Sequence, residues 1–139
     1  MIKRRASANW QGTGKEGKGT LSTQTKVLDK TQYSFGSRFE SGTGTNPEEL
    51  IGAAHAGCFA MKLSFGLNAE GFTAENLDVN AVVNFDTDKG KITEIHLDVT
   101  AKIPGITNEK FQEIAKDAKE NCPISKSLNA DVTMEARLA

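Results

Sequence analysis

The stretch that decides the fold is GTNPEELIGAAHAGCFAMKLSFGLNAE, residues 44–70. Asn46 suits a helix N-cap and Pro47 the first helical position, while two glutamates follow at the positive end of the helix dipole. Between residues 50 and 61 the only strongly polar side chain is His55. A helix that is apolar on every side must be covered on every side, so this stretch predicts a buried central helix.

Small residues recur along two sides of this helix. Gly52, Ala56 and Ala60 form one row, and Ala53 with Gly57 forms another. Such rows let a second backbone approach closely, a geometric rule that does not need a membrane. One sheet can cover only one side of the helix, and few elements remain for the others. We therefore predict a symmetric homodimer in which two central helices pack together.

The segments around the helix alternate between apolar and polar residues, as strands do. Strands are predicted at residues 2–10, 21–25, 33–39, 77–85, 95–103 and 132–138. The central helix is expected to end near residues 68–71. A second helix is expected after Thr107, with a buried stripe of Phe111, Ile114, Ala115 and Ala118. This order predicts an α+β fold in a single domain, residues 1–139.

One motif near the N-terminus imitates a phosphate-binding loop. Gly12, Gly17 and Lys18 have the right spacing, but Gly19 stands where Ser or Thr is needed. A strand pattern follows instead of the helix whose N-terminus would bind the phosphate. We expect a mobile hairpin here.

Composition narrows the classes of partner. The 139 residues carry 17 Lys+Arg and 18 Asp+Glu, a net charge of −1, so no global field attracts nucleic acid or acidic membranes. The basic start MIKRR is followed by ASANWQG, which is no signal-peptide core, and the apolar run at 50–61 is too short to span a bilayer. We expect a cytoplasmic protein that binds neither nucleic acid nor membrane.

Cys58 lies in the middle of the central helix, too far from its start for the helix dipole to ionise the thiol. A reactive Cys58 therefore needs a cation from elsewhere. At about 100° per residue, Glu48 lies roughly 80° from Cys58 around the helix, and Glu49 lies near 180°. A carboxylate beside Cys58 makes sense only if it holds an arginine in place. Without such an arrangement, Cys58 would be an inert core residue.

Two other residues bear on the chemistry. Cys122 precedes Pro123 at a predicted helix start, a setting that suits a disulfide role. His55 shares a helix face with Cys58, which leaves open a metal site or a base–nucleophile pair. Zinc needs more ligands than the sequence offers nearby, so we favour a packed, hydrogen-bonded His55 that lines the site.

Three segments resemble one family: RFE at 38–40, GTNPEELIGAAHAGCF at 44–59 and CPISKSL at 122–128. They look like the OsmC/Ohr family of hydroperoxide peroxidases, and the similarity runs over nearly the whole chain. The resemblance implies antiparallel sheets wrapped around central helices in an intertwined homodimer. It also implies reduction of organic hydroperoxides, and more weakly hydrogen peroxide, to alcohols without metal, flavin or haem. By the same resemblance Cys58 is the peroxidatic cysteine, Cys122 the resolving one, Arg38 the activating cation and Glu48 its orienting partner.

The implied cycle runs through a sulfenic acid and a disulfide that an external dithiol reduces. The apolar helix surface would favour alkyl hydroperoxides; it comprises Leu50, Ile51, Ala54, Phe59 and Met61. Strand alternation places Arg38 on the polar face of its strand, opposite Phe39. Arg38 can then reach Cys58 only if this polar face turns toward the site, for example across a dimer interface. A dimeric carrier of hydrophobic ligands and a redox sensor are the alternative functions.

Overall fold

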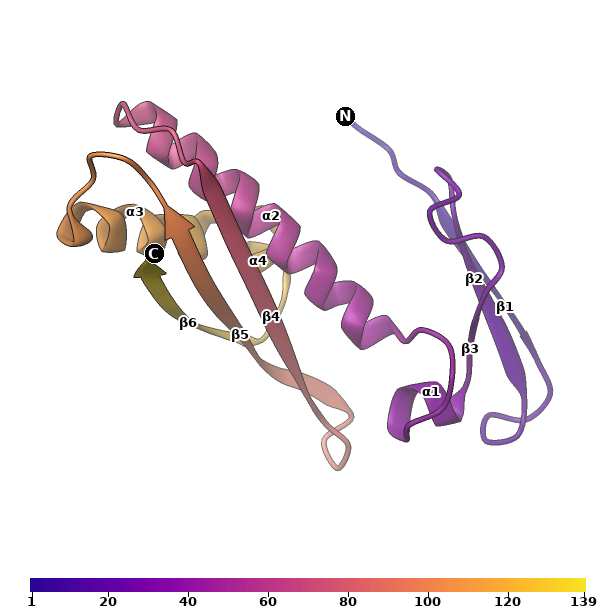
Figure 1. Ribbon diagram of the computed structural model, residues 1–139. Helices are drawn as coiled ribbons and strands as arrows, with labels where there is room; N and C mark the ends of the chain where they lie inside the picture. Colours follow the sequence, from indigo (N-terminus) through magenta and orange to yellow (C-terminus); the bar gives the residue numbers. More distant parts are fainter. The chain divides into compact units, whose positions relative to one another are not determined.

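The computed structural model describes residues 1–139. Six strands and four helices follow one another along the chain (Figure 1). Their bounds are β1 Ala6–Gln11, β2 Lys18–Thr23, β3 Thr31–Tyr33, α1 Phe35–Phe39, α2 Pro47–Ala69, β4 Asn76–Asp86, β5 Lys91–Lys102, α3 Asn108–Asn121, α4 Pro123–Ser127 and β6 Asp131–Leu138. The chain divides into two units, Met1–Leu50 and Ile51–Ala139.

The first unit holds an antiparallel sheet in the order β1-β2-β3. The strands β1 and β2 form a hairpin whose last pair is Gln11 with Lys18. Within its turn, the Gly17 N–H donates to the Thr13 carbonyl at 2.8 Å. A strand follows this glycine-rich turn, so the imitation phosphate loop is a hairpin, as predicted. The first strand begins at Ala6 rather than at residue 2.

The prediction of a strand through residues 33–39 is wrong after Tyr33. Ser34 caps the short helix α1: its hydroxyl accepts the Ser37 N–H at 3.1 Å, and the Ser37 hydroxyl accepts the Ser34 N–H at 2.8 Å. This reciprocal capping box satisfies two backbone donors and makes one helical turn favourable. The aromatic spacing that resembled a strand face also fits a helix, where the rings of Phe35 and Phe39 contact each other at a tilt of 51°, with their centroids 4.9 Å apart.

The central helix α2 begins as predicted. The Asn46 side chain accepts the Glu49 N–H at 2.7 Å, as an N-cap does. The reciprocal half of a capping box is not seen, because the Glu49 carboxylate accepts from the Thr45 hydroxyl at 2.7 Å instead. After the last turn Gly71 adopts a φ of 88°, and the Phe72 N–H bonds back to the Leu67 carbonyl at 2.9 Å. This left-handed glycine ends the helix where the sequence predicted.

At 23 residues and a mean hydropathy of 1.3, α2 is long and apolar enough to cross a bilayer. The apolar run that appeared too short is thus part of a longer helix. Its buried residues, however, recur every three or four positions: Gly52, His55, Phe59, Leu63 and Leu67. That spacing is the stripe of a helix packed on one side, as the core helix of a globular unit is.

The second unit holds a sheet in the order β4-β5-β6. The strands β4 and β5 are antiparallel, with Val79 opposite Val99. The strand β6 runs parallel to β5. This is possible because α3 and α4, which lie between the two strands in sequence, return the chain to the end of the sheet where β5 begins. The α+β fold class is confirmed, with one parallel pair that the sequence did not reveal.

Two helices, α2 and α3, lie along one face of this sheet (Figure 1). A Cβ atom on Gly52 would come within 3.2 Å of Val83, so the first small-residue row marks a close approach of α2 to β4. In α3 the predicted cap is confirmed, since the Thr107 hydroxyl accepts the Lys110 N–H at 3.2 Å. The predicted buried stripe is also confirmed: Phe111, Ile114, Ala115 and Ala118. The core that results positions the middle of α2 and the end of α3.

Candidate active site

The two cysteines lie side by side in the second unit. The Sγ atoms of Cys58 and Cys122 are 3.0 Å apart, and both thiols are free. Cys122 is buried, whereas Cys58 is half-buried and the more accessible of the two. A disulfide bond is about 2.05 Å long, so a shift of about 1 Å would join the two sulfurs. The sequence placed both residues in the site, but their contact could not be derived from spacing.

Two helices fix the position of Cys122. It caps the C-terminus of α3, where its N–H donates to the Ala118 carbonyl at 2.9 Å, and it is also the N-cap of α4. Pro123 occupies the first position of α4 and forces the chain out of α3. The second thiol therefore stands at a sharp corner between two helices.

The surroundings of Cys58 within its own unit do not activate it. Burial raises the pKa of the Cys58 thiol above its ordinary value, and the neighbouring Cys122 adds to this effect. The Ile124 N–H, which bonds to the Cys58 sulfur, and the positive charge of Lys62 act in the opposite direction. Burial dominates, so a thiolate at Cys58 needs a further cation.

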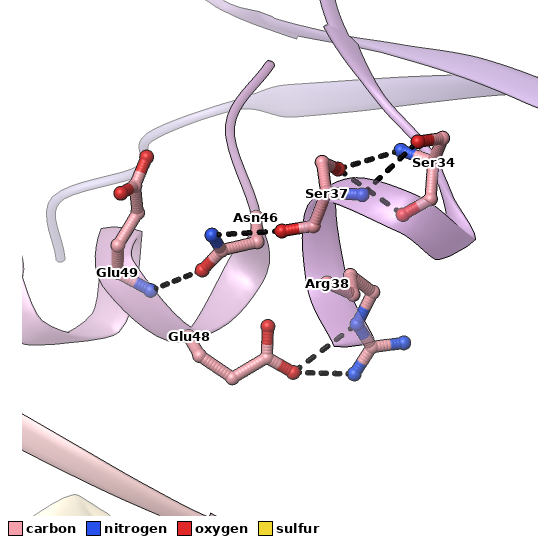
Figure 2. A network of polar contacts seen from close by, with 6 residues as sticks. All are labelled: Ser34, Ser37, Arg38, Asn46, Glu48 and Glu49. Carbon is pink, nitrogen blue, oxygen red and sulfur yellow. Dashed lines mark hydrogen bonds and ion pairs between the residues drawn. The ribbon is translucent and has the colours of Figure 1, made fainter. Parts of the chain in front are cut away.

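Arg38 and Glu48 form an ion pair in the first unit (Figure 2). The guanidinium donates to the Glu48 Oε1 atom twice, from Nε at 3.1 Å and from Nη2 at 2.5 Å. The other carboxylate oxygen, Oε2, is buried without a hydrogen-bond partner. The Arg38 guanidinium also lies 4.8 Å from the centre of the Phe39 ring. The two donors on one oxygen fix the direction in which the arginine points.

A polar network ties Arg38 to the start of α2 (Figure 2). The Asn46 amide donates to the Ser37 carbonyl at 3.2 Å while its oxygen caps α2. Glu49 lies beside Glu48 but pairs with Thr45, not with the arginine. Because Arg38 stands on a helix, the predicted conflict between its strand face and that of Phe39 does not arise.

His55 is fully buried one helical turn before Cys58. Its Nε2 atom lies 2.7 Å from the Ser125 hydroxyl, whereas Nδ1 is buried and has no hydrogen-bond partner. Burial lowers the pKa of His55, so the ring is neutral at physiological pH. The predicted packed, hydrogen-bonded histidine is confirmed, and no cluster of three metal-ligating side chains is formed.

The structure corrects the predicted apolar surface in one respect. Phe59 is fully buried in the core and cannot contact a substrate, whereas Met61 is 64% exposed. The sequence did not point to three residues that influence the site: Lys62, whose charge acts on Cys58, and Ile124 and Ser125, which bond to Cys58 and His55. The last two lie inside the CPISKSL segment, which was the only sequence signal for them.

The fold and these contacts define an α+β protein with a dithiol beside its long central helix and an arginine held by a carboxylate. The chain belongs to the OsmC-like family, since the family model described as OsmC-like protein matches residues 40–137. It is 46% identical over 139 residues to Peroxiredoxin OsmC of Escherichia coli (strain K12), covering 99% of this chain and 97% of that protein.

More distant relatives belong to the Ohr branch. The organic hydroperoxide resistance protein OhrB of Bacillus subtilis (strain 168) is 30% identical over 124 residues, covering 86% of this chain and 89% of that protein. Among solved structures, the OsmC-like protein VCA0330 from Vibrio cholerae superposes with a TM-score of 0.76 at 20% identity, covering 99% of this chain and 100% of that one. The match to VCA0330 supports the fold.

Proposed function

We propose that this chain is a cysteine-based peroxidase that reduces organic hydroperoxides, and more weakly hydrogen peroxide, to alcohols. The observation that carries the proposal is the 3.0 Å contact between a half-buried and a buried free thiol. Relatives named for peroxiredoxin activity and for organic hydroperoxide resistance support it. A role in defence against peroxide stress follows from this activity.

In the proposed mechanism the Cys58 thiolate attacks the distal oxygen of the peroxide bond, the one that carries hydrogen. The O–O bond breaks, the alkoxide leaves and takes up a proton as an alcohol, and Cys58 becomes a sulfenic acid. Cys122 then attacks the Cys58 sulfur, which forms a disulfide and releases water. An external dithiol reduces this disulfide and restores both thiols. The cycle requires no metal or organic cofactor.

Arg38 is the proposed cation for this thiolate and for the leaving alkoxide, with Glu48 as its orienting partner. Glu48 precedes Cys58 by ten residues on one helix. A regular helix rises about 1.5 Å per residue, so ten residues correspond to about 15 Å, more than a direct contact spans. We therefore assign the arginine that serves each Cys58 to the second protomer of a homodimer.

Apolar surface on α2 supports this homodimer. Met61 and Phe65 are 64% and 65% exposed on the face that also carries Ala53, Ala54 and Gly57. A Cβ atom added to Gly57 would meet nothing within 4 Å, so the second small-residue row is open. An exposed apolar helix face of this length calls for a cover, and a second copy of α2 supplies one of matching shape. We propose that each chain is one OsmC-like domain of a cytoplasmic dimer.

The test is steady-state consumption of cumene hydroperoxide with dithiothreitol as reductant. Cys58→Ser should abolish turnover, while Cys122→Ser should allow one rapid oxidation followed by slow turnover that depends on the reductant. Unchanged turnover in Cys58→Ser would contradict the assignment and favour a carrier of hydrophobic ligands. A single oxidation of the wild-type protein that no dithiol reverses would favour a redox sensor.

A further inference from the structure

Three polar contacts hold the corner that carries Cys122 to α2, in addition to the packing of Ile124 and Leu128 against the core. The first joins the two sulfurs at 3.0 Å, and the second is the bond from the Ile124 N–H to the Cys58 sulfur. The third is the 2.7 Å contact between His55 Nε2 and the Ser125 hydroxyl. Only the third involves no sulfur atom.

The helix α4 depends on such contacts. It has five residues and no side-chain bond at its N-cap, and a single helical turn is not stable on its own. Its backbone bonds join Lys126 to Cys122 and Leu128 to Ile124, both at 3.1 Å. These local bonds hold the turn together, but they do not attach it to α2.

Oxidation changes the first two contacts and leaves the third intact. When Cys58 is oxidised to a sulfenic acid, the contact between its sulfur and the Cys122 thiol changes, because the Cys58 sulfur now carries an oxygen atom. This oxygen atom also competes with the sulfur for the Ile124 N–H. His55 is fully buried and neutral, and its bond to Ser125 reaches across 70 residues of sequence. This bond therefore persists while the sulfenic acid waits for the second thiol.

We propose that the His55–Ser125 hydrogen bond is a positioning device that keeps Cys122 within reach of oxidised Cys58, and so sets the rate of disulfide formation. The inference rests on the proposed peroxidase function. The step it serves is balanced: the Cys122 sulfur attacks the Cys58 sulfur, the S–O bond breaks, and hydroxide leaves with the thiol proton as water. Both residues act through Cys122 and do not touch the peroxide.

The experiment compares Ser125→Ala, Ser125→Thr and the matched control Ser127→Ala, whose hydroxyl bonds only to the Pro123 carbonyl of its own helix at 2.7 Å. Each reduced protein receives cumene hydroperoxide, and the sulfenic acid and the disulfide are followed separately by quenching and mass spectrometry. Ser125→Ala should form the sulfenic acid at the wild-type rate but close the disulfide about fivefold more slowly, equivalent to about 1 kcal/mol for one hydrogen bond.

Under excess peroxide the slower closure should increase the fraction of Cys58 oxidised to sulfinic acid. Ser125→Thr keeps a hydroxyl and should restore closure, and Ser127→Ala should match the wild type. A merely structural role would lower thermal stability without separating the two rates. Disulfide closure in Ser125→Ala at the wild-type rate would overturn the proposal.

A second arm needs no peroxide. The disulfide reagent 4,4′-dithiodipyridine releases one thiopyridone when it modifies Cys58, the more accessible thiol, and a second when Cys122 displaces the first adduct. Only the second release should slow in Ser125→Ala. If peroxide does not oxidise the wild-type protein, and the reagent closes the disulfide at the same rate in the wild type and in Ser125→Ala, the proposed function and the positioning role are both wrong. If peroxide does not oxidise the wild-type protein, but the disulfide formed with the reagent closes more slowly in Ser125→Ala, only the proposed function is wrong.

Discussion

Glu48 and Glu49 provide a matched pair for a test of the arginine. They are neighbours in the first turn of α2, but Glu48 accepts two bonds from Arg38, whereas Glu49 accepts one from Thr45. Substitution of either by glutamine removes one negative charge from the same helix terminus. Any difference between the two variants therefore reports on the Arg38–Glu48 pair.

The size of the effect follows from the exposure of the pair. The side chains of Arg38 and Glu48 are 33% and 14% exposed, so solvent screens them only in part. An exposed ion pair is worth up to about 1 kcal/mol, and the two-point bond raises this to about 1–2 kcal/mol. Glutamine keeps an acceptor for Arg38 but loses the charge. It also places an amide group near the buried, unpartnered Oε2 position.

We expect Glu48→Gln to lower the free energy of unfolding by about 1 kcal/mol, a change of about 4 °C in Tm. The loss in kcat/KM should be larger, about 100-fold, because a misplaced catalytic group is costly even after a shift of about 1 Å. Glu49→Gln should lower kcat/KM less than about threefold, since glutamine keeps an acceptor for the Thr45 hydroxyl and the lost charge removes a dipole interaction of about 0.5 kcal/mol. Thermal unfolding and hydroperoxide turnover measure the two quantities. Equal activity in the two variants would refute the orienting role of Glu48.

Three further predictions concern other parts of the chain. The rate at which iodoacetamide alkylates Cys58 should rise with pH, because the thiolate is the reactive form. Lys62→Gln should move this pH profile to higher pH, because the positive charge of Lys62 lowers the pKa of Cys58. An unchanged profile would exclude this role of Lys62. Met61→Glu should shift the sedimentation equilibrium from dimer to monomer, whereas the control Lys116→Glu, at an exposed position of α3, should not, and a dimer in both would contradict the proposed interface. Phe59→Ala should lower the free energy of unfolding in urea by about 3–5 kcal/mol because its ring is fully buried, and a loss below about 1 kcal/mol would contradict that packing.

The sequence predicted the elements whose signals are local. Asn46 with Pro47 marks the start of α2, and Thr107 marks the start of α3, because capping depends on residues a few positions apart. The alternation at residues 77–85 and 95–103 likewise predicted two strands, which form the pair β4 and β5. Alternation failed at residues 33–39, where serine capping competes with strand formation and prevails.

Most contacts between segments far apart in the sequence could not be predicted from local capping or alternation. The parallel pairing of β6 with β5 depends on how α3 and α4 return the chain, which no periodicity encodes. The phase of α2 favoured Glu48 over Glu49 as the partner of an arginine, and the ion pair with Arg38 agrees with that choice. The 3.0 Å approach of the two sulfurs joins positions 64 residues apart, so it became visible only in the folded chain.

The most direct test of the central claim is the mass of the reduced protein after one equivalent of cumene hydroperoxide. We predict that the wild-type chain loses two hydrogen atoms and yields a single peptide pair joined through Cys58 and Cys122. The Cys122→Ser variant should instead gain one oxygen atom at Cys58. An unchanged mass in both proteins, or an oxygen atom added at any residue other than Cys58, would contradict the account.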